Sequence, residues 1–240
     1  MLNIMRLVTD QVFAMRHRGQ SHWPAAADVA GAPAGGGPAL AVARLKYPGN
    51  CDPEPLALER FRRVMAAREN ARVEIVGPIA IEDLPKHPVR LAHLGGTGAF
   101  ALTVAEVAVL RKFVADGGTL LLEAVGGDET FARQAQQYLE ALCPGKKLAD
   151  LPPDSQLFTL DGNQIKSVTY GRRTLQRVGR TAPTPMIKAV FFDNQPRIYL
   201  SREDITTGLL GCPYFTVDGY SGRSAYYLFR NILLLSHQKP

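Results

Sequence analysis

Cysteine and histidine are scarce in this chain of 240 residues, which has three cysteines and five histidines. The cysteines, Cys51, Cys143 and Cys212, are too few and too scattered for a disulfide framework or a Cys-x-x-Cys metal site. We interpret each of them as a small buried hydrophobic residue. No two histidines have the spacing of metal ligands. The sequence therefore predicts neither a metal nor any other cofactor.

Long apolar runs are also missing. No segment approaches the roughly 18 to 20 apolar residues that a membrane-spanning helix needs, so we expect no transmembrane segment. Residues 1–18 contain scattered apolar residues interrupted by Arg6 and Asp10, without a compact apolar core followed by a cleavage site. We therefore expect no signal peptide, which leaves a cytoplasmic and an envelope-associated location both open.

Motifs of nucleophilic catalysis and of nucleotide binding are absent. The chain has no Gly-x-Ser-x-Gly elbow, and no cysteine stands in the turn after a predicted strand as a nucleophile would. The stretch 95–98 is glycine-rich but lacks the Gly-x-x-x-x-Gly-Lys-Ser/Thr spacing of a phosphate loop. No Gly-x-Gly-x-x-Gly follows the first predicted strand with an acid about 20 residues later. Tight turns between strands and helices account for these glycines.

Acidic residues are missing from residues 162–192, whereas the same stretch contains six lysines and arginines. Clustered cations attract phosphates or carboxylates. This segment is therefore a candidate basic surface for an anionic partner, formed by Arg172, Arg173, Arg177 and Arg180. The alternative is a solvated hairpin, or a face whose cations pair with acids elsewhere in the fold. We expect a small molecule or a protein of unknown identity as the partner, and not a nucleic acid.

Residues 94–142 organise the rest of the chain. Thr103 and Glu106 have the spacing of a capping box, which predicts the start of a helix. Gly117 and Gly118 stand where a helix end needs a residue that tolerates positive φ. The apolar run at 119–122 is typical of a parallel strand covered on both faces. A second glycine loop and a second helix, which ends near Pro144, follow this run. The stretch therefore predicts an α/β layer fold.

The pattern extends on both sides of this stretch. Residues 1–38 combine an amphipathic helical spacing at 3–18 with an Ala-, Gly- and Pro-rich linker, and residues 39–240 form the predicted α/β domain. Further strands are predicted at 39–47, 73–76 and 89–94, and further helices at 56–69 and 224–236. Alternating strands and helices indicate a parallel sheet with right-handed crossovers.

The region of about 150–197 has a different pattern, which we interpret as a β-rich excursion. Short strands are predicted there and just beyond it, separated by turn sequences, at 157–160, 164–170, 187–192 and 197–201. The last of them is expected to return to the main sheet. Residues 208–222 are loop-like.

In open parallel sheets the ligand crevice lies beyond the carboxyl ends of the strands, where the strand order reverses. The predicted strand ends supply these candidates for a ligand-binding cleft: Tyr47, Asn50, Gly96, Thr97, Glu123, Gly127, Asp128 and Asp204.

Glu123 stands out among these candidates because it follows three leucines at the end of a buried strand. A carboxylate there costs several kcal/mol unless it is paired or hydrogen-bonded. It is a candidate general base or ligand anchor. The alternatives are that it pairs with Arg44 or Arg90, or emerges into solvent. His93, inside a predicted strand, is expected to be a hydrogen-bonded core residue rather than a catalyst.

Several short blocks of sequence are informative when they are taken together, in the order in which they occur. They are ARLKYPG at 43–49, GGTG at 95–98, LTxxE at 102–106 with LR at 110–111, GGTL at 117–120, IYLSxxD at 198–204, and 225–231. Covering about residues 39–236, they resemble a bacterial family catalogued only as domain of unknown function 4159. That family is similar in fold to class I glutamine amidotransferase-like domains. These are flavodoxin-like three-layer sandwiches that also serve as noncatalytic binding modules. The resemblance implies this fold and no established activity.

The chain departs from a working amidotransferase at two points. Residues 123–127, Glu-Ala-Val-Gly-Gly, stand where the nucleophile elbow and its cysteine are expected, and no His-x-Glu follows late in the chain. Amidotransferase activity through a Cys–His pair is therefore not expected.

Three functions remain as hypotheses from the sequence. The first is a noncatalytic ligand-binding module with Asn50, Thr97, Glu123 and Asp128 lining a cleft. The second is a hydrolase acting on a sugar derivative, with Glu123 and Asp204 as paired carboxylates about 5 to 10 Å apart. The third is a scaffold that uses the basic surface within 162–192.

Overall fold

The computed structural model describes residues 39–179, 185–211 and 216–238. The predicted N-terminal helix and linker at 1–38 lie outside these residues. The strands are β1 (Ala39–Lys46), β2 (Arg72–Ala80), β3 (Leu91–Gly96), β4 (Thr119–Ala124), β5 (Ala149–Asp150), β6 (Ile187–Phe192) and β7 (Gln195–Ser201). The helices are α3 (Ala57–Glu69), η1 (Ile81–Lys86), α4 (Val104–Ala115), η2 (Val125–Gly127), α5 (Glu129–Leu142), α6 (Gln156–Thr159), α7 (Arg172–Val178), α8 (Thr206–Leu209) and α9 (Gly222–His237).

The seven strands form one sheet in the order β2-β1-β3-β4-β7-β6-β5. The pairs β2–β1, β1–β3, β3–β4 and β4–β7 are parallel. The strand β6 runs antiparallel to β7, and β5 runs antiparallel to β6. Because the chain leaves β1 towards β2 and then returns to β3 on its other side, the strand order reverses between β1 and β3. The fold is therefore α/β with a mostly parallel sheet, as the sequence predicts.

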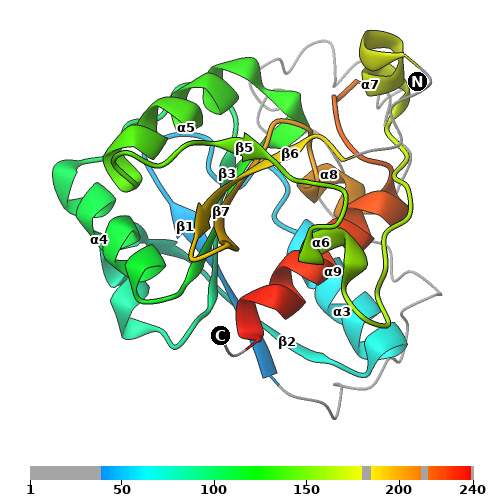
Figure 1. Ribbon diagram of the computed structural model, residues 1–240, viewed down its shortest axis with the longest axis horizontal. Helices are drawn as coiled ribbons and strands as arrows, with labels where there is room; N and C mark the ends of the chain where they lie inside the picture. The colour runs from blue at the N-terminus through cyan, green and yellow to red at the C-terminus, as the bar shows by residue number, and fades with distance from the viewer. Residues whose placement is uncertain (1–38, 180–184, 212–215, 239–240) are drawn as a thin grey trace, which may run out of the picture.

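Helices cover both faces of the sheet (Figure 1). The core between the sheet and α4 and α5 contains Leu120 and Leu122, whereas Leu121 belongs to the core beneath α3 and α9. Successive side chains of a strand point to opposite faces. A strand buried on both sides therefore needs consecutive apolar residues, which explains the uninterrupted leucine run of β4.

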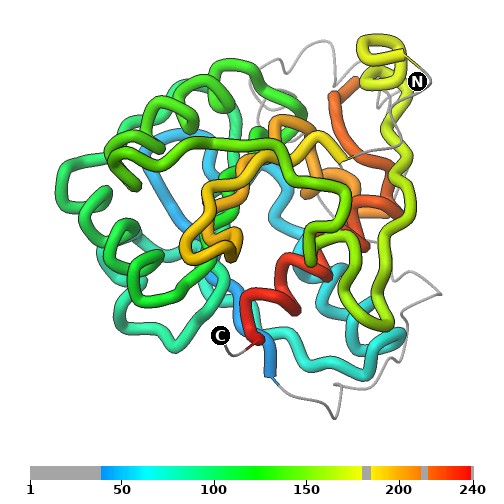
Figure 2. Tube along the Cα trace, viewed as in Figure 1, coloured from blue at the N-terminus to red at the C-terminus, as the bar shows by residue number. Residues whose placement is uncertain are grey.

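The helices α3 and α9 are far apart in the sequence but lie side by side on one face, as the cyan and red segments of Figure 2 show. The ring of Phe61 on α3 lies 4.9 Å from that of Phe229 and 5.7 Å from that of Tyr226, both on α9. The longest of the described helices, α9, has 16 residues. Within the described ranges, no helix is long and apolar enough to cross a membrane.

The central stretch folds as predicted. Thr103 and Glu106 form the capping box at the start of α4, where the backbone N–H of Thr103 donates to Glu106 Oε2 at 2.6 Å. The backbone N–H of Glu106 donates in return to Thr103 Oγ1 at 3.2 Å. Gly117 follows the helix with a φ of 91°, a conformation that glycine adopts without steric cost. The strand β4 lies between β3 and β7 and is parallel to both.

The prediction of a β-rich excursion at about 150–197 is wrong for its first half. Residues 157–160 fall mostly in the helical turn α6, and residues 164–170 form no strand apart from one bridge between Tyr170 and Tyr220. Residues 172–178, which carry most of the basic cluster, form the helix α7. The strands at 187–192 and 197–201 are present, and the second pairs with β4 as expected. The loop-like region at 208–222 starts with the end of α8.

Candidate functional site

The crevice between the carboxyl ends of β1 and β3 is closed by the residues of its own rim. Asn50 Nδ2 donates to Thr97 Oγ1 at 2.7 Å, and the backbone N–H of Thr97 donates to the Asn50 carbonyl at 3.2 Å. The buried Tyr47 hydroxyl donates to the same carbonyl at 3.1 Å. A Cβ atom at position 96 would collide with the Tyr47 hydroxyl, so this close approach requires Gly96. Four predicted site residues thus lie together, bonded to one another.

The space left in this crevice is small. The cavity that reaches Arg44, Cys51, His93 and Thr206 has a volume of about 10 Å³. That volume holds about one water molecule. The described residues therefore leave no room for an organic ligand in this cavity.

Glu123 is fully buried and accepts four hydrogen bonds. Its Oε2 is 2.8 Å from His93 Nε2 and accepts from the Thr206 hydroxyl at 2.8 Å. Its Oε1 accepts from the backbone N–H groups of Ile205 and Thr206 at 2.8 and 2.7 Å. This carboxylate ties the end of β4 to β3 and to the first turn of α8.

The meeting of Glu123 with His93 follows from the pairing of β3 with β4. His93 is opposite Leu121, and Gly95 is opposite Glu123. Leu121 and Glu123 are two positions apart and share a face of the sheet, so the side chains of His93 and Glu123 both point to the α9 face. A Cβ atom at Gly95 would lie 2.7 Å from His93 Nε2, and its absence leaves room for the ring beside the carboxylate. Glu123 pairs with neither Arg44 nor Arg90, which were the two arginines considered from the sequence. Arg44 instead bonds Asp52 at 3.0 Å.

Asp204 is the second fully buried carboxylate at this rim. Its Oδ1 accepts from the backbone N–H of Thr207 at 2.6 Å, and its Oδ2 accepts from the Thr207 hydroxyl at 2.5 Å. Oδ2 also accepts from the backbone N–H of Gly126, which joins the loop after β4 to the loop after β7. Like Glu123, this side chain uses its oxygens to hold loops of the fold together.

The two carboxyls have opposite pKa shifts. Burial opposes ionisation of Glu123, but the hydrogen bonds from His93 and Thr206 outweigh it and hold the pKa of Glu123 below its ordinary value. Burial, followed by the negative charge of Glu123, raises the pKa of Asp204 to about 7. Opposed pKa values in a pair of carboxyls are typical of acid and base roles. Here, however, both groups are enclosed, and each is bonded to the protein itself.

Gly127 and Asp128 lie at the start of α5. Gly127 has a φ of 72° and packs against Asp218, where a Cβ atom would clash with that residue's backbone carbonyl. Asp128 Oδ1 accepts from the backbone N–H of Phe131 at 2.9 Å and thereby caps the helix. Both positions therefore have a structural role in the turn from β4 to α5.

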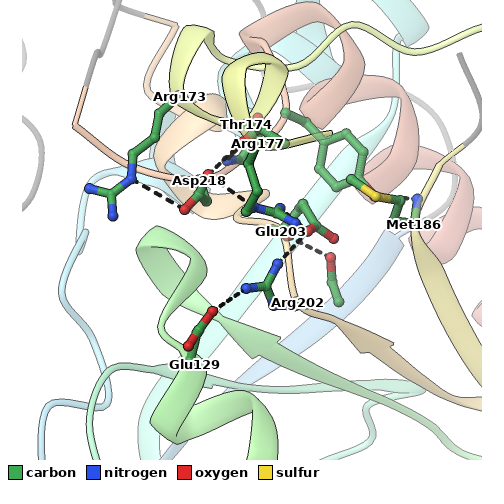
Figure 3. Close-up of polar contacts among 11 residues, drawn as sticks. Glu129, Arg173, Thr174, Arg177, Met186, Arg202, Glu203 and Asp218 are labelled. Carbon is green, nitrogen blue, oxygen red and sulfur yellow. Dashed lines mark hydrogen bonds and ion pairs between the residues drawn. The ribbon is translucent and has the colours of Figure 1, made fainter. Parts of the chain in front are cut away.

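The basic cluster on α7 is largely neutralised by acids of the neighbouring loops (Figure 3). Arg177 contacts Glu203 at 2.6 Å and Asp218 at 3.5 Å, and Arg173 contacts Asp218 at 3.3 Å. Glu203 also contacts Arg202, which reaches Glu129 at the start of α5. Arg172 is exposed, and Arg180 lies outside the described residues. Pairing with acids elsewhere in the fold, one of the two alternatives, thus describes Arg173 and Arg177.

A much larger cavity lies next to this chain of ion pairs. It has a volume of about 880 Å³ and is bounded by α5, the Arg177 end of α7, the start of β6 and the carboxyl end of β7. We call it the arginine cavity. Its charged lining residues are Glu129, Arg133, Asp150, Arg177, Lys188, Arg202 and Glu203, and its apolar ones include Ala132, Leu151, Met186 and Leu200.

Sequence reasoning named Arg177 but missed the other residues of the arginine cavity, although part of the signal was present. Arg202 and Glu203 directly follow β7, at a strand end that the sequence identifies. Arg133 lies one turn after Glu129 on the helix that starts at the same rim. The thirteen lining residues come from segments as far apart as α5 and the loop after β7, and only the fold brings them together.

Metal binding finds no support in the part of the chain that the structure describes, because it contains no group of three or more His, Cys, Asp or Glu side chains arranged to hold an ion. The fold and the site together define an α/β protein with a mostly parallel sheet, whose buried Glu123 and Asp204 are hydrogen-bonded within the fold and whose main described strand-end cavity is lined by ion pairs.

The chain belongs to the family described as Domain of unknown function (DUF4159), which matches residues 41–208. A comparison with curated proteins finds no match. The description of the family names no activity.

Proposed function

We propose that this protein is a noncatalytic ligand-binding module and that a small molecule binds in the arginine cavity. The observation that carries the proposal is a contrast between two parts of the same rim. Where the sequence suggested a cleft, Glu123 and Asp204 are fully buried and bonded within the fold. A few residues further along, a cavity of about 880 Å³ is open to solvent and lined by charged and apolar side chains.

The size and lining of the arginine cavity support this proposal. Small-molecule sites usually measure about 300–1,000 Å³ and combine apolar walls with a few polar groups that fix orientation. Here Leu151, Met186 and Leu200 supply apolar surface, and Arg133 and Arg202 supply hydrogen-bond donors. The cavity also lies beyond the carboxyl end of β7, on the rim where open α/β sheets bind ligands.

The saturation of the buried carboxyls argues against the hydrolase alternative. A pair of catalytic carboxyls has to reach a substrate, with a separation of about 5 to 10 Å across the scissile bond. Glu123 already accepts four hydrogen bonds, and Asp204 accepts three. The scaffold alternative loses support as well, since Arg173 and Arg177 are engaged by Asp218 and Glu203.

A thermal-shift screen with a metabolite library tests the proposal. A ligand that binds only the native state raises the melting temperature, by an amount that grows with its concentration relative to Kd. The half-buried Ala132 lines the cavity, so Ala132→Trp fills it without removing a hydrogen bond of the fold. We expect this variant to lose the shift.

The matched control is Gln137→Trp, which adds the same side chain to an exposed position of α5 that does not line the cavity. It should keep the full shift. A ligand whose shift is the same in wild type and in Ala132→Trp binds elsewhere. If every hit behaves in that way, or if no compound shifts the melting temperature, the proposal is wrong.

A further inference from the structure

The charges around the arginine cavity do not balance. Its three acids are all engaged by lining cations: Glu129 by Arg202, Glu203 by Arg177 and Arg202, and Asp150 by Lys188 at 3.7 Å. The fourth lining cation, Arg133, is exposed on α5 and has no ion pair with any described residue. Four cations and three acids leave one positive charge without a counterpart, which favours a ligand with one negative charge.

A buried acceptor at the inner wall of the cavity also lacks a partner. Glu203 is 1% exposed, and its Oε1 accepts hydrogen bonds from Arg177 at 2.6 Å and from Arg202 at 3.4 Å. Its Oε2 is buried and accepts no hydrogen bond from any described residue. A buried carboxylate oxygen without a donor costs free energy, so this atom favours a ligand that brings an O–H or N–H group.

A neutral donor suits this position better than a cationic one. The ion pairs of Figure 3 link Glu129, Arg202, Glu203, Arg177 and Asp218 and continue to Arg173, three acids and three cations. An ammonium group would add a positive charge to a balanced network in a poorly solvated place. A hydroxyl or an amide N–H satisfies the oxygen and leaves the balance unchanged.

From these features we infer that the arginine cavity takes a small organic monoanion that also carries a hydroxyl or amide N–H. The anionic group contacts Arg133 and the donors of the partly exposed Arg202 that its own ion pairs leave unused. The hydroxyl or amide donates to Glu203 Oε2, which the carboxyl presents to the ligand by rotating about its broad terminal torsion. Apolar atoms between the two ends lie against Met186 and Leu200. This inference rests on the proposed function and adds the chemical class of the ligand.

Calorimetric titration with matched probes tests the class. N-acetyl-leucine and 2-hydroxy-4-methylpentanoate each have one carboxylate, a neutral donor and an apolar side chain. N-acetyl-leucinamide lacks the charge, and 4-methylpentanoate lacks the donor. We expect N-acetyl-leucine to bind wild type at least about tenfold more tightly than N-acetyl-leucinamide, and 2-hydroxy-4-methylpentanoate to bind it at least about tenfold more tightly than 4-methylpentanoate. A charge-assisted hydrogen bond and a satisfied buried acceptor each change the affinity by about that factor.

Two substitutions connect the binding to the residues. Arg133→Gln removes an exposed charge outside every described ion pair, so it should leave the fold intact and weaken the two complete probes about tenfold. Arg172→Gln, at an exposed position of α7 that does not line the cavity, should leave their affinity unchanged. Glu203→Gln should remove the preference for a donor-bearing acid, with the fold checked by circular dichroism.

The outcomes separate the class of ligand from the binding function itself. If neither complete probe binds, or if both bind equally well to wild type and to Arg133→Gln, the monoanion class is overturned. Suppose that the monoanion class is overturned but the thermal shift of a neutral or cationic library compound is lost in Ala132→Trp. The proposed binding module then stands, and only its ligand class is wrong. If Ala132→Trp blocks no compound of any class, both proposals fail.

Discussion

Replacing Glu123 with glutamine distinguishes a structural carboxylate from a functional one. The substitution keeps the shape of the side chain but removes its charge, while the site itself stays fully buried. Active-site groups are often poorly satisfied, and neutralising them tends to stabilise a protein. A carboxylate that holds loops together has the opposite effect.

The magnitude follows from the four hydrogen bonds. Hydrogen bonds to a charged group contribute about 1.5–3 kcal/mol each, and neutral ones about 0.5–1.5. The amide oxygen of glutamine still accepts from the backbone N–H groups of Ile205 and Thr206, at a loss of about 1 kcal/mol for each. The amide nitrogen faces His93 and the Thr206 hydroxyl, where it can only donate. We expect Glu123→Gln to lower the free energy of unfolding by about 2–4 kcal/mol.

Urea unfolding at pH 8, followed by far-ultraviolet circular dichroism, measures this change. The control is Glu140→Gln, which alters an exposed glutamate of α5 and should shift the free energy of unfolding by less than about 0.5 kcal/mol. A Glu123→Gln protein as stable as wild type, or more stable, refutes the structural role. It would return Glu123 to the list of candidate catalytic groups.

Three further predictions concern the rim and the fold. Because the pKa of Asp204 rises from an ordinary 3.8 to about 7, the folded state holds a proton that the unfolded state has released, and this contribution to stability is lost as the pH rises through 7. The free energy of unfolding of wild type should therefore fall between pH 5.5 and 8 relative to Asp204→Asn, and parallel pH profiles would contradict this assignment. Gly96→Ala should cost about 1–3 kcal/mol through its clashes with the Tyr47 hydroxyl and the Asn50 carbonyl, and Tyr47→Phe should restore the part that the hydroxyl causes; no restoration would assign the whole cost to the Asn50 carbonyl. Thr103→Ala should cost about 1 kcal/mol in urea unfolding by removing the cap of α4, and an unchanged midpoint would mean that the cap contributes nothing.

The parallel half of the fold could be predicted because its local signals agree with its tertiary environment. The capping box at Thr103 starts α4, and the leucine run lies in a strand covered on both faces. Each of these signals depends on neighbours within a few positions of the chain. Local physical chemistry is therefore enough to place them.

The first half of the region at about 150–197 was harder to predict because its apolar residues pack in the core without pairing in a sheet. Ile165, Val168 and Tyr170 are buried in the core beneath α9, and the backbone N–H of Thr169 donates to Ser224 Oγ of that helix at 2.8 Å. The apolar residues predict a buried segment correctly. Whether this segment packs against a strand or a helix depends on contacts more than fifty residues away, which the local pattern does not specify.

The candidate site was predictable in place but not in partners. Glu123 could be assigned to the end of a buried strand from the residues before it. Its bond to His93 depends on the register that sets Gly95 opposite Glu123. Its bonds to Thr206 depend on β7 lying next to β4. Neither relation is written in the spacing of the residues concerned, so the sequence left an arginine, solvent and a ligand as alternatives.

The position of the arginine cavity follows from the one part of the sheet that is not parallel. Each parallel crossover brings a helix that covers a face of the sheet. The strand β6 comes after α7 in the chain and pairs with β7 as an antiparallel neighbour, and no helix among the described residues connects these two strands. Lys188 and Leu200, opposite each other in the β6–β7 pair, line the cavity facing α5, and Asp150 of β5 pairs with Lys188 beyond them.

The space that ordinary α/β sheets leave where the strand order reverses is filled here by Tyr47 and Asn50. The space that a crossover helix would otherwise fill remains open beside α5. A ligand at this rim therefore meets the sheet at its antiparallel edge, where side chains of both signs line the wall. For that reason we expect substitutions at Arg133 or Ala132, and not at Asn50 or Thr97, to change what the protein binds.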